Sequence, residues 1–364
     1  MATRRGFLAG ALAAGATQAF AAQSLAMAAP APRLVAAAKL GQRDGGLLWS
    51  ADRQLVFDLP ARGHAPSHLP GGRVVVMSRR PGLFGTMFDA GDPSSRTVFA
   101  PSDGYRFAGH AVASPDGRMM VTTEFEAASF AGRVVSRDLE TGAERAVWIP
   151  GGIEPHELLF AKGGSRLIVA LGGLIKDGGV AGPAFNDGGI DSAVVELDPG
   201  SGAVLARHKL GAASLSWRHM AVSPDGETVA VAGQDQDITV KRPLVGLLRP
   251  GKGIEALAWP DPHDFDFRSY VGSVAIDRSG TYVAAASPRG SVLGLWRLAD
   301  GQWHGGLAIA DVCGLTAAAE PGMFWASTGL GGVVKIAANS STGGPRIDAQ
   351  WHADAGFDNH LLLV

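Results

Sequence analysis

One stretch of the sequence decides the fold: GHAVASPDGRMMVTTE, at residues 109–124. It consists of a histidine, an apolar run, a turn whose glycine lies seven residues after the histidine, and a second apolar run. Two further stretches keep this order closely, PHELLFAKGGSRLIVALG at 155–172 and WRHMAVSPDGETVAVAGQ at 217–234. Apolar runs on both sides of a glycine-containing turn are typical of a β-hairpin.

Looser copies extend the repeat along the chain. The copy at 62–78 has one extra glycine in its turn, two later copies carry Ser273 and Leu315 (or Gly314) in place of the histidine, and a shortened copy ends the chain at 360–364. Neighbouring copies are 42 to 54 residues apart, except for an interval of 63 residues that contains a glycine-rich loop at 172–191. A period of about 40–50 residues with four short strands is typical of a β-propeller blade.

The seven copies therefore predict an all-β chain that forms one seven-bladed β-propeller with WD40- or YVTN-like repeats. In the second copy the four strands are expected at 110–114, 118–123, 133–138 and 143–149. The last copy supplies a single strand, and the three strands that it lacks are expected near the N-terminus, at 33–40, 45–51 and 54–59. The last blade would then mix strands from both ends of the chain, which removes the exposed edges of an open array.

Composition excludes several classes of protein. A chain with 46% hydrophobic and 18% charged residues folds, and a net charge of −2 offers no basic stripe for nucleic acid. The single cysteine, Cys313, rules out an intrachain disulfide and a thiolate metal cage, so a buried structural thiol is expected. The sequence has no phosphate loop, no haem-attachment motif and no Ser-His-Asp arrangement. We therefore expect no nucleotide, no covalent haem and no catalytic residue.

The N-terminus predicts export. The sequence TRRGFL at 3–8 precedes a run rich in alanine, glycine and leucine, with cleavage options after Ala21 or Ala28. This pattern is typical of a twin-arginine signal peptide, which we place at 1–28, and the propeller domain then occupies 29–364. The apolar run is short for a membrane span, so no stable span is expected after the signal is removed. The mature protein is expected in the periplasm, exported in the folded state, where a single cysteine suits the oxidising compartment.

The repeat places half of the ten histidines at one equivalent position. They belong to blades one to four and blade seven, which are consecutive around the ring: His64, His110, His156, His219 and His360. The first strand of a propeller blade lies nearest the axis, so residues at its start face the central channel. The sequence therefore predicts a ring of imidazoles in the channel.

A ring of histidine side chains around a channel has two chemical uses. Neutral imidazole is a ligand for iron, copper and zinc, and the ring nitrogens of such a site would lie roughly 3–4 Å apart. Protonatable donors could instead bind an anion or a substrate carbonyl. Five neighbouring residues could orient the imidazoles: Glu154, Glu157, Arg218, Asp358 and Asn359. Arg218 would oppose a cation if it pointed inward. The structural alternative is that the histidines bond to neighbouring blades.

Several motifs together resemble the family of domain-of-unknown-function 1513 proteins. They are Arg62-Gly63-His64, Arg79-Arg80-Pro81-Gly82, Gly109-His110 with Ser114-Pro115-Asp116-Gly117, Gly152-Ile153-Glu154-Pro155-His156-Glu157, Arg218-His219, Ser287-Pro288-Arg289-Gly290 and Asp358-Asn359-His360. The resemblance covers nearly all of the mature chain. It implies a propeller-like periplasmic protein of Gram-negative bacteria. Such proteins tend to be encoded beside imelysin-type and di-haem oxidoreductase-like proteins, which implies a role in iron acquisition and no established activity.

Three functional hypotheses follow. The first is a periplasmic propeller whose histidine ring binds a transition metal (Fe, Cu or Zn) and assists iron or copper acquisition, with periplasmic iron-uptake proteins as partners. The second is a non-catalytic scaffold for protein interactions, with structural histidines. The third, a lactonase- or quinoprotein-like enzyme, ranks last because lactonase propellers hold Ca²⁺ with oxygen ligands, whereas this position supplies imidazoles.

Overall fold

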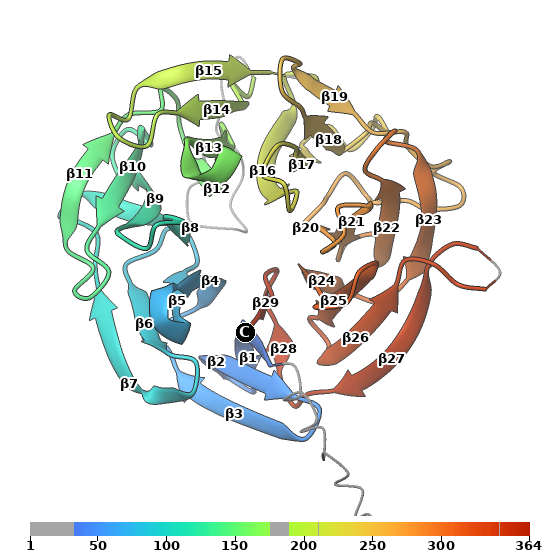
Figure 1. Cartoon of the computed structure of the whole chain (residues 1–364), viewed down its shortest axis with the longest axis horizontal. Helices are drawn as coiled ribbons and strands as arrows, with labels where there is room; N and C mark the ends of the chain where they lie inside the picture. Colours follow the sequence, from blue (N-terminus) through green and yellow to red (C-terminus); the bar gives the residue numbers. More distant parts are fainter. Residues whose placement is uncertain (1–32, 175–188, 210, 342) are drawn as a thin grey trace, which may run out of the picture. The chain divides into compact units, whose positions relative to one another are not determined.

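The computed structural model describes residues 33–174, 189–209, 211–341 and 343–364. The predicted signal peptide at 1–28 and most of the predicted loop at 172–191 lie outside these residues. Within them, seven antiparallel sheets stand around a central axis (Figure 1). This arrangement confirms the predicted seven-bladed propeller. No helix in the described part of the chain is long and apolar enough to cross a membrane.

The first four blades follow the chain in order, and the first strand of each is innermost (Figure 1). Blade one contains β4 (Gly63–Leu69), β5 (Arg73–Ser78), β6 (Gly85–Asp89) and β7 (Asp92–Phe99). Blade two contains β8 (Tyr105–Ala113), β9 (Met120–Glu126), β10 (Gly132–Arg137) and β11 (Glu144–Trp148). Blade three contains β12 (Pro155–Ala161), β13 (Arg166–Leu171), β14 (Ala193–Leu197) and β15 (Val204–His208). Blade four contains β16 (Leu215–Val222), β17 (Val229–Asp235), β18 (Val245–Leu248) and β19 (Ile254–Ala256).

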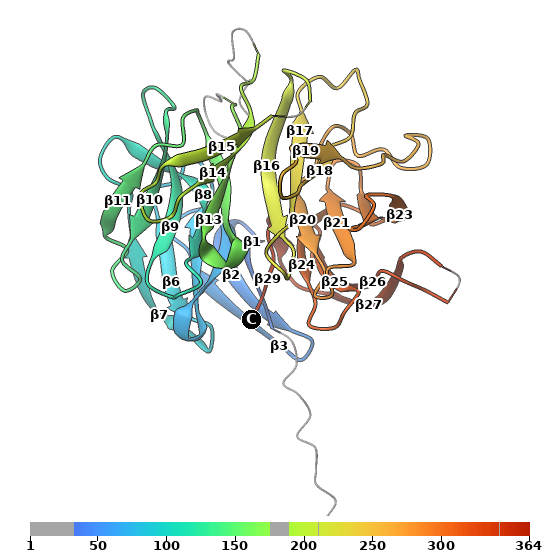
Figure 2. The same cartoon turned by 45° about the horizontal axis from the view of Figure 1, so that its top comes forward.

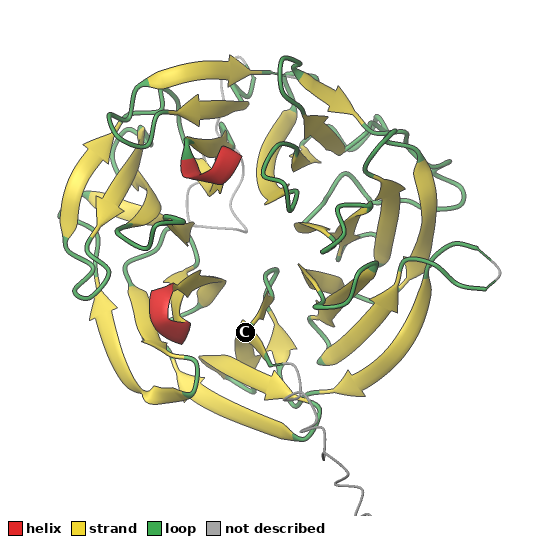
Figure 3. Cartoon of the chain, viewed as in Figure 1, coloured by secondary structure: helices red, strands yellow, loops and turns green. Residues whose placement is uncertain are grey.

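The remaining blades complete the ring. Blade five contains β20 (Ser273–Ile276), β21 (Tyr282–Ser287), β22 (Val292–Arg297) and β23 (Trp303–Ala308). Blade six contains β24 (Val312–Ala317), β25 (Met323–Thr328), β26 (Gly332–Ala337) and β27 (Arg346–His352). Two single 3-10 turns, η1 (Pro70–Gly72) and η2 (Lys162–Gly164), are the helical elements of the described residues, and Figure 3 colours them red.

Blade seven joins the two ends of the chain. Its outer strands are β1 (Leu34–Leu40), β2 (Arg43–Ser50) and β3 (Arg53–Asp58), as the sequence predicted. The expected single strand at 360–364 is instead two short strands, β28 (Gly356–Phe357) and β29 (Leu362–Leu363), and both pair with β1. Between them the chain leaves regular pairing, and this interval carries Asp358 and His360. The closing strand is interrupted where its side chains turn towards the axis.

The repeated turn is held by its own side chains. In blade two the Ser114 hydroxyl donates to Asp116, and it accepts hydrogen bonds from the backbone N–H groups of Arg118 and Met119. Gly117 has a φ of +67°, a left-handed conformation that glycine adopts without steric cost. Blade four repeats the arrangement with Ser223 and Gly226, at a φ of +76°. The Ser-Pro-Asp-Gly sequence therefore fixes the hairpin between the first two strands of these blades.

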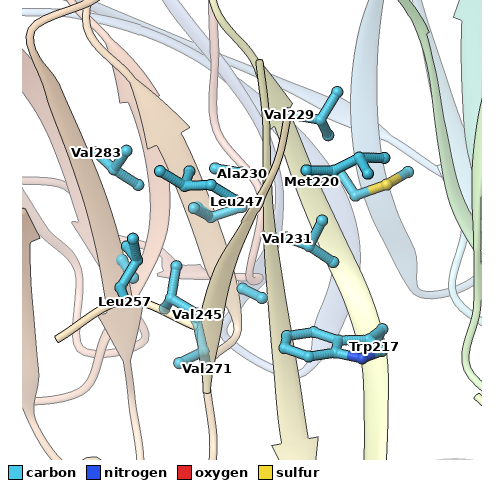
Figure 4. Close-up of a cluster of buried hydrophobic side chains, with 14 of the residues drawn as sticks. Trp217, Met220, Val229, Ala230, Val231, Val245, Leu247, Leu257, Val271 and Val283 are labelled. Carbon is cyan, nitrogen blue, oxygen red and sulfur yellow. The ribbon is translucent and has the colours of Figure 1, made fainter. Parts of the chain in front are cut away.

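The hydrophobic core lies between the blades. Figure 4 shows part of the cluster around blade four, in which Leu247, Val245 and Val231 are fully buried. Leu247 and Val245 lie on the side of Val283 of blade five, and Val231 lies on the opposite side with Met220. Separate clusters of this kind fill the other interfaces described. The innermost strands converge on the axis, as the tilted view in Figure 2 shows. Packing between blades thus fixes the position of each innermost strand.

Shortening one core side chain tests this account of stability. We expect Leu247→Ala to lower the free energy of unfolding by about 2–5 kcal/mol, because it leaves a cavity in a core with little room to collapse. Val204 on β15 is 49% exposed, so Val204→Ala is the control and should change stability by less than about 0.5 kcal/mol. Urea unfolding followed by tryptophan fluorescence measures both. Equal losses would contradict a core located between the blades.

Candidate metal centre

The histidines lie where the innermost strands are irregular. The pairing register shifts between Gly63 and Pro66, between Phe107 and Ala111, and between Pro155 and Glu157, and each interval contains the predicted histidine of its blade. In blade four the shift lies between Trp217 and His219. A β-bulge inserts extra residues into a strand and redirects a side chain. The bulges therefore give these histidines an orientation that regular alternation would not.

The five imidazoles form one cluster. Ring centroids of His64 lie 5.1 Å from those of His110 and 4.5 Å from those of His360. His156 and His219 are 5.0 Å apart, and each also lies near His110, at 5.3 and 6.1 Å. Four of these five histidine residues are at most 4% exposed. Side chains from five blades therefore meet on the axis, as the repeat predicted.

Two overlapping triads have metal-site dimensions. One is His64, His110 and His360, and the other is His110, His156 and His219. Within each triad one nitrogen per ring lies within 4.8 Å of the other two. This bound is wider than the roughly 3–4 Å of a loaded site, so the rings would draw together around an ion. His110 belongs to both triads and is the central residue of the cluster.

Asp358 orients His64. Its Oδ1 accepts a hydrogen bond from Nδ1 of His64 at 2.8 Å, which leaves Nε2 with the lone pair. Burial alone would raise the pKa of Asp358. The hydrogen bond from His64 and the charges of Arg79 and Arg62 outweigh burial and hold that pKa well below its ordinary value. A permanently ionised carboxylate on the far nitrogen is the usual support of a metal-binding imidazole.

Glu157 lies beside histidines of the two neighbouring blades. Its Oε2 lies 3.2 Å from Nδ1 of His219, and its Oε1 lies 3.8 Å from Nδ1 of His110. Burial raises the pKa of Glu157 to about 8. The sequence placed this residue beside His156, its chain neighbour. The structure turns it to the opposite side of β12, between blades two and four.

Arg218 and Glu154 act on His156. The Arg218 guanidinium points inward and donates to Nδ1 of His156 at 3.0 Å and to Oε1 of Glu154 at 2.6 Å. Nδ1 of His156 is therefore an acceptor, and the proton of this imidazole lies on Nε2. Glu154 also pairs with Arg80 and has a φ of +52°, a strained conformation for a residue other than glycine. The proton of His156 therefore lies on Nε2, whereas that of His64 lies on Nδ1.

Three ring nitrogens are buried without a partner. They are the Nε2 atoms of His110, His219 and His360. A buried polar atom without a hydrogen bond costs about 1–3 kcal/mol, so three such atoms in one cluster are expensive. The same three residues line a cavity of about 160 Å³ that Ser273 and Leu315, the equivalent residues of blades five and six, also line. The cluster therefore places three unpartnered ring nitrogens beside a cavity on the side of the two non-histidine blades.

The imidazoles are neutral near pH 7. Burial is the largest cause in every case, and it lowers the pKa of His64 and, further still, the pKa values of the other four. Mutual repulsion among the rings and the charge of Arg218 act in the same direction. Neutral imidazole is the form that binds a metal.

A second cavity lies on the other side of the cluster. It also measures about 160 Å³, and His64, His156 and His219 line it together with a set of mainly polar residues: Arg79, Arg80, Arg218, Gln234, Tyr270, Pro288, Arg289 and Asn359. Arg79, Arg80 and Arg289 lie in turns that follow the second strands of blades one and five. Tyr270 and Gln234 were not expected to be functional. Tyr270 comes just before Ser273, and Gln234 lies near the end of β17. This position beside a repeat is the one sequence feature that could have marked them as residues of the site.

Other predicted residues have roles of their own. Asn359 was expected to orient His360, but its amide donates to the Tyr270 hydroxyl at 3.1 Å. Cys313 is 3% exposed, and burial raises its pKa to about 12, as expected for an inert structural thiol. A histidine outside the repeat, His208, contacts Glu196 on the outer part of blade three. Among the described residues, the cluster therefore contains only histidines of the repeat.

Gly109 offers a test of the packing around His64. A Cβ atom at Gly109, where φ is +116°, would lie 2.7 Å from Cδ2 of His64. Gly104 also has a positive φ, +82°, but its Cβ would meet nothing within 4 Å. Both substitutions to alanine strain the backbone, and only Gly109→Ala also displaces the ring. We expect Gly109→Ala to cost about 1–3 kcal/mol more than Gly104→Ala in urea unfolding. Equal costs would show that the ring has room to move.

The metal-free protein should lose stability in weak acid. The five histidines have lowered folded-state pKa values, so their contribution is complete above the unfolded value of about 6.5 and is lost as the pH falls below it. Each histidine changes the free energy of unfolding by up to about 1.4 kcal/mol per pH unit. Glu157, whose pKa is raised, binds a proton in the folded state and so changes the stability in the opposite direction. We expect a loss of several kcal/mol between pH 7 and pH 5, measured by urea unfolding in EDTA. His110→Gln should make the dependence shallower and His208→Gln should not; a flat profile would contradict neutral buried rings.

Comparisons with known proteins agree with this fold and name a family. No curated protein matches the chain. Among solved structures, a chain of Kuenenia stuttgartiensis hydrazine synthase has a TM-score of 0.61 and 12% identity, with 78% of this chain and 86% of that chain covered. A chain of a mitotic checkpoint complex has a TM-score of 0.60 and 14% identity, with 80% and 77% covered. At these identities the likeness concerns the fold alone. The model of the family described as "Protein of unknown function (DUF1513)" matches residues 57–364, so the chain belongs to that family.

Proposed function

We propose that this chain is a transition-metal-binding propeller that holds one ion on its axis with imidazole ligands. The observation that carries the proposal is the set of three unpartnered Nε2 atoms, on His110, His219 and His360. They belong to a cluster of buried, neutral rings whose two triads could hold a metal ion. A ligand that accepts lone pairs would satisfy these atoms at once.

A purely structural role accounts for less of the geometry. The bond between His64 and Asp358 does join blades one and seven, as a structural histidine would. In a purely structural role both ring nitrogens of each histidine should form hydrogen bonds, because buried polar atoms in native proteins are nearly always paired. Three unpartnered ring nitrogens in a buried cluster would cost several kcal/mol without a compensating bond. We therefore favour binding over scaffolding.

The donor set selects the class of metal. Imidazole nitrogens suit iron, copper, zinc and nickel, whereas calcium and magnesium prefer oxygen ligands. The triad of His64, His110 and His360 fits best, because Asp358 holds the proton of His64 on Nδ1. The second triad includes His156, whose Nε2 carries a proton while Arg218 donates to Nδ1. His219 lies 5.0 Å from His360 between ring centroids and is the next ligand available.

The biological setting belongs to the same proposal. The twin-arginine pattern at 3–8 supports export to the periplasm in the folded state. A folded export route suits a site that exists only when five blades have closed around it. The resemblance of the motifs to the family supports a part in iron or copper acquisition, with periplasmic iron-uptake proteins as partners.

Metal binding is directly measurable. We expect the purified, EDTA-treated protein to take up one equivalent of Fe²⁺, Cu²⁺ or Zn²⁺ by elemental analysis, and its melting temperature to rise with the metal. His110→Ala should weaken binding at least tenfold, because His110 belongs to both triads. His208→Ala is the matched control, since it removes a histidine outside the cluster.

The outcome of the metal titration either supports or contradicts the proposal. Selective loss in His110→Ala supports the site on the axis. If none of the three metals binds, or if His208→Ala weakens binding as much as His110→Ala does, the proposal is wrong. A stable His110→Ala protein with unchanged metal uptake would also overturn it, so urea unfolding of each variant accompanies the titration.

A further inference from the structure

The cavity bounded by Arg79, Arg80, Arg218 and Arg289 lies directly against the histidine cluster, and we call it the arginine pocket. Its other lining residues include the polar side chains of Gln234, Tyr270 and Asn359, with His64, His156 and His219 on the side of the cluster. Guanidinium groups that converge on one small cavity are typical of sites for carboxylate or phosphate groups.

The pocket has more positive than negative charge. Among the described residues, two carboxylates contact three of its four guanidinium groups. Glu154 pairs with Arg80 and Arg218, and Asp358 pairs with Arg79. Asp358 also binds Arg62, a fifth arginine, so its negative charge is already shared. Burial and the neighbouring Arg218 lower the pKa of Arg80 only to about 10, so Arg80 keeps its charge at neutral pH.

Some donors of the pocket remain available. Arg289 is exposed and lies over the Tyr270 ring at 4.5 Å, and no carboxylate in the described part of the chain pairs with it. Nε of Arg79 is buried without a hydrogen-bond partner. An arginine stacked on an aromatic ring is held in place while its N–H groups stay free for a ligand. The pocket is therefore prepared for an anion.

The positive charges of the arginines would also repel a metal ion bound to the histidines. A bare cation on the histidines would face four guanidinium groups across the wall that His64, His156 and His219 form. Repulsion between like charges at such short range is large in a poorly solvated site. An anion between the guanidinium groups and the ion would turn this repulsion into attraction on both sides.

We propose that the arginine pocket binds a small oxyanion with two or more negative charges, and that this anion is the counter-ion of the metal. The natural cargo is then a metal ion together with an oxyanion, such as a small polycarboxylate or phosphate. The counter-ion part rests on the metal-binding function proposed above, whereas the anion site stands on the arginines alone.

Anion binding is first measured without metal. Citrate and inorganic phosphate are titrated by calorimetry into the EDTA-treated and desalted protein, and the two probes distinguish a carboxylate from a phosphate ligand. We expect saturable binding of at least one of them. Arg289→Ala should weaken it tenfold or more, and Arg289→Lys should fall between, because lysine keeps the charge and loses the planar contact. The control is Arg118→Ala, whose side chain is 86% exposed and lies outside the pocket.

Metal is then added to separate the two parts. One equivalent of the metal that binds should tighten the anion in the wild-type protein at least tenfold and leave the His110→Ala protein unchanged. No binding of either anion, or equal effects of Arg118→Ala and Arg289→Ala, would overturn the anion site. Anion binding whose affinity does not change when the metal is added would overturn the counter-ion part. Anion binding in a protein that takes up no metal would end the proposed metal function and leave the anion site standing.

Discussion

The bulge in the innermost strand is the feature on which the rest of the site depends. In a regular strand, side chains alternate between the two faces of the blade and would pack against its neighbours. The register shifts at Gly63–Pro66, Phe107–Ala111 and Pro155–Glu157 break this alternation beside the histidine, so the ring points to the axis. Blade five carries Ser273 and pairs without such a shift, whereas blade six has a shift and no histidine. The bulge therefore permits an axial histidine but does not require one.

Crowding on the axis then determines the chemistry. Rings whose centroids are 4.5 to 5.3 Å apart, and which water scarcely reaches, cannot all carry charge, so they are neutral at neutral pH. Their far nitrogens are held across blade boundaries. Asp358 of blade seven reaches His64 of blade one, and Glu157 of blade three reaches His219 of blade four. Because Asp358 lies in the strand interval that closes the ring, the orientation of His64 depends on closure. The site and the closed fold therefore form together.

The sequence predicted the fold and the five histidines because both follow a simple period. Glycine seven residues after histidine marks the hairpin, and the same count aligns the histidines. The partners of the rings have no such period. Glu157 is next to His156 in the chain and yet serves His219 and His110, because strand alternation and the bulge turn it to the other side. Asn359 bonds to Tyr270 of another blade, a contact that no local spacing specifies. The arginine pocket combines turns from separate blades, so only the closed ring reveals it.

The two sides of the histidine cluster have opposite electrostatic character. Towards the arginine pocket, four guanidinium groups surround a cavity with two shared carboxylates. Towards the other cavity, Glu157 lies beside the rings, with its pKa raised by burial to about 8. Burial raises that pKa because it removes the carboxylate from water, and a metal ion on the rings would act in the opposite direction. An ion would therefore favour ionised Glu157 on one side and an oxyanion on the other. The axis would then hold alternating charges, and the proposed cation could lie close to the arginines.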